Sequence, residues 1–404
     1  MARTLVVTND FPPKQGGIEN FVYQLVRRLP ADQVVVFTSS ADGAADFDAQ
    51  LAFPVVRART RVLLPTPHIA RGAALLARRF GCDSVYFGAA ASLGLMAPYV
   101  RDNSPAKQFI GSTHSHECFW TRMPALRQTL RTLANGLDHL TFISNYAEGV
   151  IGAAVAPDVR RRMVRLSPGV DPAQFAPEAF AQVADAAPPP GQPTPGGPGS
   201  SPAGRVDDPA DGRDGPAWGS GPQIISVSRL VPHKGQDTLI KALPAVRAAV
   251  PDARLTIVGG GSNSARLAGL IQTLGLQDAA RLVGPVPNAD IAPYYAAASV
   301  FALPTRDRTA GLQVEGLPLV CLEAAAAGLP LVVGNSGGAP ETVKPGQTGL
   351  VVDSLDQGSV ASALIELLAD RPRAAAMGEA GRAWMAAEWT WDQRAALLQS
   401  LLTA

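Results

Sequence analysis

Four charged residues in the C-terminal half have types and spacings that suit the binding of a phosphorylated sugar. Arg229 and Lys234 flank the tetrapeptide Leu-Val-Pro-His directly after the β-branched run 224–228. Two cations that converge there need an anion between them, because burying both unpaired is costly. The planar Arg fork and the compact Lys charge together suit a diphosphate. A solvated basic loop is the alternative for the same residues.

The two carboxylates of this group, Glu315 and Glu323, are eight residues apart. Glu315 precedes a helix that Pro318 is expected to open at its first turn, and Glu323 lies inside that helix among apolar residues. A carboxylate buried there needs donors, such as the vicinal hydroxyls of a ribose, whereas Glu315 at the loop tip is better placed to meet a transferred sugar. The preference of helix N-termini for acids explains Glu315 without any function, but it does not explain Glu323.

Glycine pairs occupy two of the predicted strand-to-helix loops. Gly16 and Gly17 precede the first helix, and Gly337, Gly338 and Ala339 begin the run Gly-Gly-Ala-Pro-Glu. Without side chains, backbone N–H groups and a helix N-terminus can approach phosphate or sugar oxygens. A tight turn that requires glycine is the alternative.

The N-terminal half contributes a pair of histidines. His114 follows the predicted strand 108–112 through Thr113, and His116 comes two residues later. A histidine at the carboxyl end of a strand can donate to sugar hydroxyls or shuttle a proton, although a structural histidine fits equally well.

The elements that must position these residues follow a βαβ rhythm. Short β-branched runs alternate with Ala/Leu-rich helical periods, which predicts an α/β fold of two Rossmann-like, doubly wound parallel-sheet domains that face each other across a cleft. The predicted strands are 4–8, 33–38, 84–87, 108–112, 139–143, 223–228, 254–258, 281–283, 300–303, 331–333 and 350–352, and the first helix is 18–29. Ligands collect at the carboxyl ends of such strands, where the candidate residues lie.

The predicted organisation is an N-terminal domain over 1–175, an insert over 176–222, a C-terminal domain over 223–385 and a final helix within 386–404 whose packing partner is open. Residues 185–222 contain 10 Pro and 9 Gly, so they cannot offset their ordering entropy by burial and are expected to be a linker or a disordered loop.

The composition of the chain excludes several classes of function. The chain has 404 residues, 47% of them hydrophobic, and a net charge of +1, which argues against a nucleic-acid binder. The charge is uneven, because residues 1–170 hold 19 Lys and Arg against 12 Asp and Glu. Three cysteines without CxxC spacing predict neither a disulfide framework nor a zinc site, and they fit a reducing cytoplasm. No signal region or membrane span of about 20 apolar residues is evident.

Taken together, the Arg-x4-Lys and Glu-x7-Glu spacings and both glycine loops resemble the retaining glycosyltransferases of family four, which have the GT-B fold. The runs 8–13, 87–91, 112–117 and 228–237 are similar, more narrowly, to the actinobacterial mannosyltransferases that add the second mannose to phosphatidylinositol monomannoside. Ser115 stands where that pattern has glycine.

The resemblance implies a GDP-mannose donor held by the C-terminal domain and an inositol glycolipid acceptor held by the N-terminal domain. Arg229 and Lys234 would bind the diphosphate, Glu323 the ribose, and Glu315 with the Gly337 loop the donor sugar. His114, His116 and Asp10 would lie near the reaction centre on the acceptor side. No cofactor or essential metal is implied.

The same resemblance implies a cytoplasmic enzyme that is peripheral at the inner face of the plasma membrane. We expect it to dock on anionic lipid through basic residues of the N-terminal half: Arg122, Arg127, Arg131 and 160–162.

Three alternatives stay open. One is a family-four enzyme with another nucleotide sugar or a soluble acceptor such as an inositol phosphate. Another is a hydrolase that uses Glu315 and Glu323 as paired acid and base. The third is a catalytically silent nucleotide-sugar-binding protein.

Overall fold

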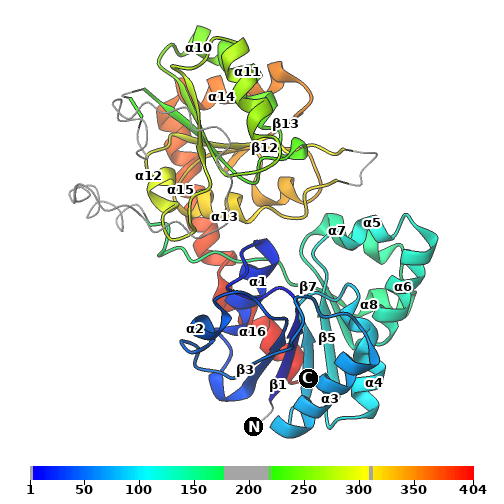
Figure 1. The fold of residues 1–404 in the computed structure, drawn as a ribbon. Coiled ribbons are helices and arrows are strands. Elements are labelled where there is room, and N and C mark those ends of the chain that lie inside the picture. Colours follow the sequence, from blue (N-terminus) through cyan, green and yellow to red (C-terminus); the bar gives the residue numbers. More distant parts are fainter. Residues whose placement is uncertain (1–2, 177–217, 220, 309–312) are drawn as a thin grey trace.

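The computed structural model describes residues 3–176, 218–219, 221–308 and 313–404, which form two α/β domains stacked end to end (Figure 1). Most of the predicted Pro/Gly-rich insert, 176–222, lies outside the described residues.

The first domain is built on a seven-stranded sheet in the order β3-β2-β1-β4-β5-β6-β7, with every neighbouring pair parallel. Its strands are β1 (Thr4–Thr8), β2 (Val34–Thr38), β3 (Val55–Arg57), β4 (Ser84–Phe87), β5 (Gln108–Ser112), β6 (His139–Phe142) and β7 (Met163–Arg165). Its helices are α1 (Gly17–Val26), η1 (Ala31–Gln33), α2 (Ala44–Asp48), α3 (Pro67–Phe80), η2 (Leu93–Met96), α4 (Ala97–Asp102), α5 (Glu117–Trp120), α6 (Pro124–Asn135), α7 (Asn145–Gly152) and α8 (Pro157–Arg161).

The second domain repeats this plan with a six-stranded parallel sheet in the order β10-β9-β8-β11-β12-β13. Its strands are β8 (Gln223–Val227), β9 (Arg254–Val258), β10 (Ala280–Gly284), β11 (Val300–Leu303), β12 (Leu331–Gly334) and β13 (Gly349–Val352). Its helices are η3 (Pro232–Lys234), α10 (Gln236–Ala249), α11 (Ser264–Thr273), α12 (Ala292–Ala296), α13 (Leu319–Ala326), η4 (Ala339–Thr342), α14 (Gln357–Ala369) and α15 (Arg371–Glu388).

Helices cover both faces of each sheet, and the apolar residues divide accordingly. Leu5 and Val7 of β1 pack in one core cluster and Val6 in another, as the alternation of side chains along a strand requires. The cluster that holds Val6 also holds Leu331 and Val333 of β12, so one apolar core is shared by the two domains.

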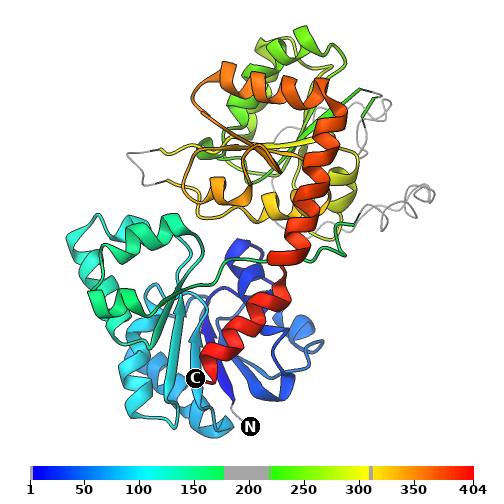
Figure 2. The same cartoon turned by 180° about the vertical axis from the view of Figure 1, so that it is seen from behind.

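The last helix, α16 (Trp391–Leu402), returns to the first domain after α15 ends, and there it packs on α1, β4 and β5 (Figure 2). At this crossover the Val170 N–H donates to the Trp389 carbonyl at 2.7 Å. A side chain on Gly169 would lie 2.6 Å from the Trp391 nitrogen, so the two crossing segments touch through backbone.

The predicted fold class is confirmed, and each predicted strand is present with ends that agree to within one residue. The edge strands β3 and β7, which have three residues each, were not predicted from the sequence. Helix α1 ends at Val26 instead of 29, and Pro318 caps α13 instead of occupying its first turn. Within the described ranges, no helix is both long and apolar enough to cross a membrane.

Candidate active site

Lys234 and Glu315 form a close ion pair at the carboxyl edge of the second sheet. Lys234 ends η3, directly after β8, and its Nζ lies 2.5 Å from Oε2 of Glu315. Their side chains are 12% and 10% exposed. Both residues were predicted to lie in one site, with an outside anion between the cations Arg229 and Lys234. In the structure, Glu315 itself is the anion that Lys234 contacts.

Two glycines hold this pair in place. Gly235 has φ +78°, and a side chain on it would lie 1.9 Å from the Pro304 carbonyl at the end of β11. Gly337 has φ +53°, and a side chain there would lie 1.9 Å from the Glu315 carbonyl, to which the Gly338 N–H donates at 3.0 Å. The Gly337–Gly338 turn therefore packs directly on the backbone of Glu315, a close approach that only glycine permits.

Arg229 lies in the same loop but is exposed, and within the described ranges its guanidinium has no hydrogen bond or ion pair. Its charge nevertheless acts on a neighbouring residue. Burial lowers the pKa of His233. The positive charges of Lys234 and Arg229 lower the same pKa further, and the negative charge of Glu315 raises it. Among the described residues, Arg229 is thus an exposed cation near the pair that does not contact it.

Glu323 lies in α13 and faces a different partner. Tyr295 of α12 donates to its Oε2 at 2.9 Å, and burial raises the pKa of the Glu323 carboxyl although that hydrogen bond opposes the rise. Tyr295 is fully buried. This tyrosine was not predicted from the sequence. It lies 28 residues before Glu323, and no sequence motif marks it as the partner of a carboxylate in a helix.

Cys321 of α13 is a buried thiol that lies in the field of these charges. Burial raises its pKa, a hydrogen bond with Thr342 opposes this rise, and the charges of Glu315, Lys234 and Glu323 act on it as well.

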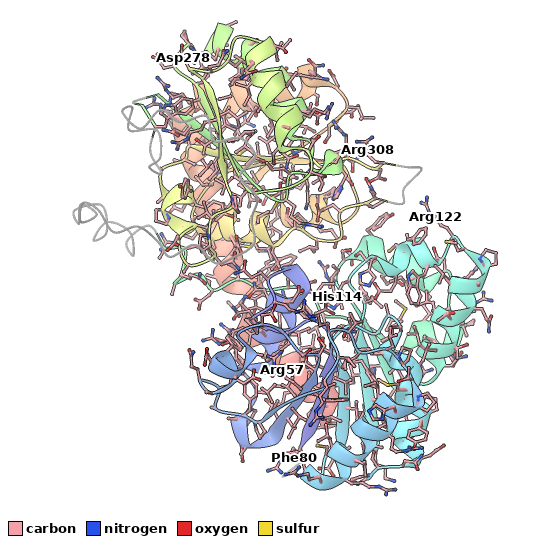
Figure 3. The ribbon with its side chains drawn as sticks, in the orientation of Figure 1. Arg57, Phe80, His114, Arg122, Asp278 and Arg308 are labelled. Carbon is pink, nitrogen blue, oxygen red and sulfur yellow. The ribbon has the colours of Figure 1, made fainter. Side chains whose placement is uncertain are left out.

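His114 lies at the upper edge of the first domain, which faces the second domain (Figure 3). Its Nε2 lies 2.6 Å from the Gly88 carbonyl, and its ring edge packs on Phe21 with 5.0 Å between centroids. Because a carbonyl only accepts, Nε2 carries the hydrogen and Nδ1 is left as an acceptor. Burial lowers the pKa of His114, so the ring is neutral near pH 7.

The residues beside His114 are arranged by a buried acid that the sequence analysis did not assign. Glu117 is fully buried, and its Oε2 accepts the His114 backbone N–H at 2.9 Å. Its Oε1 lies 3.4 Å from Nε2 of His116, whose side chain is 48% exposed. Asp10 is part-buried, and burial followed by the charge of Glu19 raises its pKa.

Loops of the two domains meet in front of these residues. A side chain on Gly316, the residue after Glu315, would lie 3.0 Å from Oγ of Ser115, the residue after His114. A side chain on Gly17 would lie 4.0 Å from Leu319 at the start of α13, and Gly16 beside it is exposed. The structure therefore brings the His114 and Gly16–Gly17 loops against the Glu315 loop.

Two doubly wound domains whose facing loops carry a buried Lys–Glu pair, an exposed arginine and a neutral histidine define a two-domain glycosyltransferase of the GT-B type. Residues 15–174 match the family model "Glycosyltransferase Family 4", and residues 213–384 match "Glycosyl transferases group 1". The chain belongs to glycosyltransferase family 4.

Its similarity to named proteins extends over the full length. It is 41% identical over 408 residues to the GDP-mannose-dependent alpha-(1-6)-phosphatidylinositol monomannoside mannosyltransferase of Mycobacterium tuberculosis, covering 100% of this chain and 98% of that protein. It is 40% identical to the corresponding monoacylated-acceptor enzyme of Corynebacterium glutamicum, covering 99% and 97%. Among solved structures, sucrose-phosphate synthase from Thermosynechococcus elongatus has the same fold, with a TM-score of 0.74 at 21% identity over 99% of this chain and 98% of that one.

Proposed function

We propose that this chain transfers mannose from GDP-mannose to a phosphatidylinositol mannoside, with retention of anomeric configuration, as the second mannosylation of a glycolipid. The observation that carries the proposal is the Lys234–Glu315 pair at the carboxyl edge of one sheet, opposite the His114–Ser115 turn of the other. The activities for which the full-length relatives are named support the choice of sugar and acceptor.

In this proposal the second domain binds the donor. Lys234 and Arg229 hold the diphosphate, which gives Lys234 a second anion and Arg229 an anionic partner. Glu323 binds the ribose hydroxyls with the carboxylate oxygen that Tyr295 does not use.

Loops of the two domains would bind the sugar and the phosphates. Glu315 and the Gly337–Ala339 turn lie against one another and would orient the mannose. The exposed Gly16–Gly17 segment, at the start of α1, offers backbone N–H groups to the diphosphate from the acceptor side.

The first domain would present the acceptor. Since the Nε2–H of His114 is committed to Gly88, the ring acts through Nδ1, which can accept a hydrogen bond from an acceptor hydroxyl and orient it. Asp10 and His116 would bind other hydroxyls of the acceptor.

The reaction we propose is a front-side displacement. The diphosphate departs, the acceptor hydroxyl enters on the same face of the sugar, and the departing oxygen takes the proton. Lys234 and Arg229 stabilise the charge that develops on the diphosphate, and the protein contributes mainly positioning and electrostatics. Because these cations supply the positive charge, no metal or other cofactor is required. Turnover that survives excess EDTA would support this, and loss of activity restored by a divalent cation would contradict it.

We also propose peripheral docking on an anionic membrane at the cytoplasmic face. Three of the arginines expected to dock are engaged within their own domain: Arg131 donates to the Ala154 carbonyl at 2.7 Å, Arg162 donates to the Leu137 carbonyl, and Arg160 pairs with Glu148. Their role in docking therefore has weak support.

A better candidate surface is the segment 58–80, which has five arginines and no acidic residue. Val62, Leu64 and Leu75 are each more than half exposed there, and the arginines at 59, 61, 71, 78 and 79 are exposed beside them. Asn9 exchanges two hydrogen bonds with the Leu63 backbone, which ties this segment to the loop that holds Asp10. Apolar side chains among cations suit an anionic bilayer, at about 1 kcal/mol per arginine. Co-sedimentation with phosphatidylinositol vesicles that falls for Leu64→Ser and Arg71→Gln, but not for Arg131→Gln, would support this surface.

The decisive test of function is mass-spectrometric detection of product. The purified chain is mixed with GDP-mannose and phosphatidylinositol monomannoside, and in parallel with UDP-glucose or with inositol phosphate. We expect a mannose-sized addition to the lipid only with GDP-mannose. Addition to inositol phosphate would favour the soluble-acceptor alternative, release of sugar from a glycoside without a nucleotide would favour the hydrolase, and binding without product would favour a silent protein.

A further inference from the structure

Glu341, the last residue of the Gly-Gly-Ala-Pro-Glu run, does not point at the sugar site. It lies in η4, and its carboxylate reaches the first domain. Oε2 accepts the backbone N–H of Asn145 at 3.0 Å, and Oε1 accepts that of Tyr146 at 3.1 Å. Arg165 of β7 pairs with Oε2 at 3.0 Å.

The two N–H groups belong to the start of α7, where backbone donors lack helical partners. Ser144 caps this helix from its own domain by accepting the Ala147 N–H at 3.2 Å. Glu341 supplies two further acceptors from the other domain. Its side chain is only 17% exposed, so these charge-assisted bonds are partly shielded from water and strong.

Arg165 extends the contact to the crossover between the domains. Its guanidinium lies over the ring of Trp389 at 5.7 Å from the centroid, and its Nε donates to Ser167 at 2.8 Å. The Trp389 carbonyl accepts the Val170 N–H, where the chain passes between the domains. One arginine thus contacts both the Glu341 loop and the crossover.

The contact also reaches the ion pair of the site. A side chain on Gly338 would lie 2.7 Å from Cβ of Ser144, so the glycine turn rests on the start of α7. The Gly338 N–H in turn holds the Glu315 carbonyl. Docking of the first domain and the position of Glu315 are therefore linked through one short turn.

We infer that Glu341 and Arg165 form an interdomain latch that positions the Gly337–Gly338 turn, and with it Glu315, when the domains dock. Glu341 is a positioning residue: it acts through the turn and does not touch a substrate. The inference concerns domain docking and goes beyond the proposed function; only its kinetic readout depends on that function.

The test compares Glu341→Gln, Arg165→Met and the double variant with the control Glu148→Gln. The control removes a 3.0 Å carboxylate–arginine pair that lies wholly within the first domain. Spin labels on Asp102→Cys and Gln277→Cys, both exposed and one in each domain, report the interdomain distance by electron–electron resonance. Turnover is measured as separate kcat and KM values.

We expect Glu341→Gln and Arg165→Met to broaden the distance distribution toward longer values and to lower kcat by about tenfold, with little change in KM for the donor. The double variant should be no worse than the more damaging single variant, and Glu148→Gln should resemble the parent. Melting curves identify any variant that fails to fold, in which case the other single variant decides the question. An unchanged distance distribution in a folded Glu341→Gln or Arg165→Met variant overturns the latch. If no substrate is turned over, the distances still test the latch while the proposed function fails alone.

Discussion

The Lys234–Glu315 pair allows stability and catalysis to be separated in one experiment. Lys234→Met, Glu315→Gln and the double variant are compared with the matched controls Lys241→Met, on an exposed part of α10, and Glu366→Gln, which breaks an exposed pair with Arg373. Both members of the site pair are about nine-tenths buried, so removing one leaves a charge without compensation.

The expected stability cost of each single change is about 3 kcal/mol, the low end for breaking a buried pair. At about 2–4 °C per kcal/mol for a domain of this size, the melting temperature should fall by about 10 °C. The double variant, which buries no unpaired charge, should recover most of this loss. Both exposed controls should change the melting temperature by about 1 °C or less.

Turnover should behave differently. In the proposed site Lys234 binds the diphosphate and Glu315 the sugar, so each substitution should lower kcat/KM at least about 100-fold, or about 2.7 kcal/mol of transition-state stabilisation. The double variant should stay inactive although it melts normally. Near-normal rates in either single variant, or recovery of activity in the double variant, would falsify the assignment of these residues to the site.

Three further predictions follow from single residues. Because burial raises the pKa of Glu323, its contribution to stability is full below the ordinary carboxyl pKa and is lost as the pH rises through the raised value. Glu323→Gln should therefore have a higher melting temperature than the parent at pH 7, and the difference should shrink toward pH 4, as calorimetry would show. The same substitution should raise the KM for the donor about tenfold, as steady-state kinetics would show. Burial lowers the pKa of His114, so its contribution is present above about pH 6.5 and lost as the pH falls through the lowered value. His114→Asn should flatten this part of the stability–pH profile and cut turnover about 100-fold, and an unchanged profile counts against the neutral ring. Ser115 has φ +73°, and its buried Oγ has no hydrogen-bond partner in the described residues, so Ser115→Gly should raise stability by about 1 kcal/mol with activity retained; a lower melting temperature contradicts the strain argument.

The sequence predicted the fold well because its strong signals are local. The strands near the middle of each sheet are buried on both faces, so they appear in the sequence as apolar, mostly β-branched runs such as Leu5–Val7 and Val332–Val333. The edge strands 55–57 and 163–165 were not predicted, because three half-buried residues are too few to show an alternation of apolar and polar side chains. The packing of α16 on the first domain was also unreadable, because Trp391 and Leu398 give an apolar face that either domain could have covered.

The site was predicted in part, and the limits have a physical reason. A charged residue beside a strand end is visible in the sequence, which is why Lys234, Glu315 and His114 could be singled out. Their hydrogen bonds depend on which loops the two folded sheets bring together. Three of these contacts join segments at least 26 residues apart: Lys234 with Glu315, Tyr295 with Glu323, and the His114 ring with the Gly88 carbonyl.

The Lys234–Glu315 pair also explains how the charge of Lys234 can be held in position before a ligand binds. A buried ammonium without a counter-charge carries a large desolvation cost. Glu315 supplies that counter-charge at 2.5 Å, and the Gly337–Gly338 turn fixes the backbone of Glu315. The desolvation cost of the cation is thus met during folding, so its charge is already oriented when a leaving group develops negative charge. In the proposed site, Arg229, which is exposed and has no partner among the described residues, would be the part that moves onto the ligand.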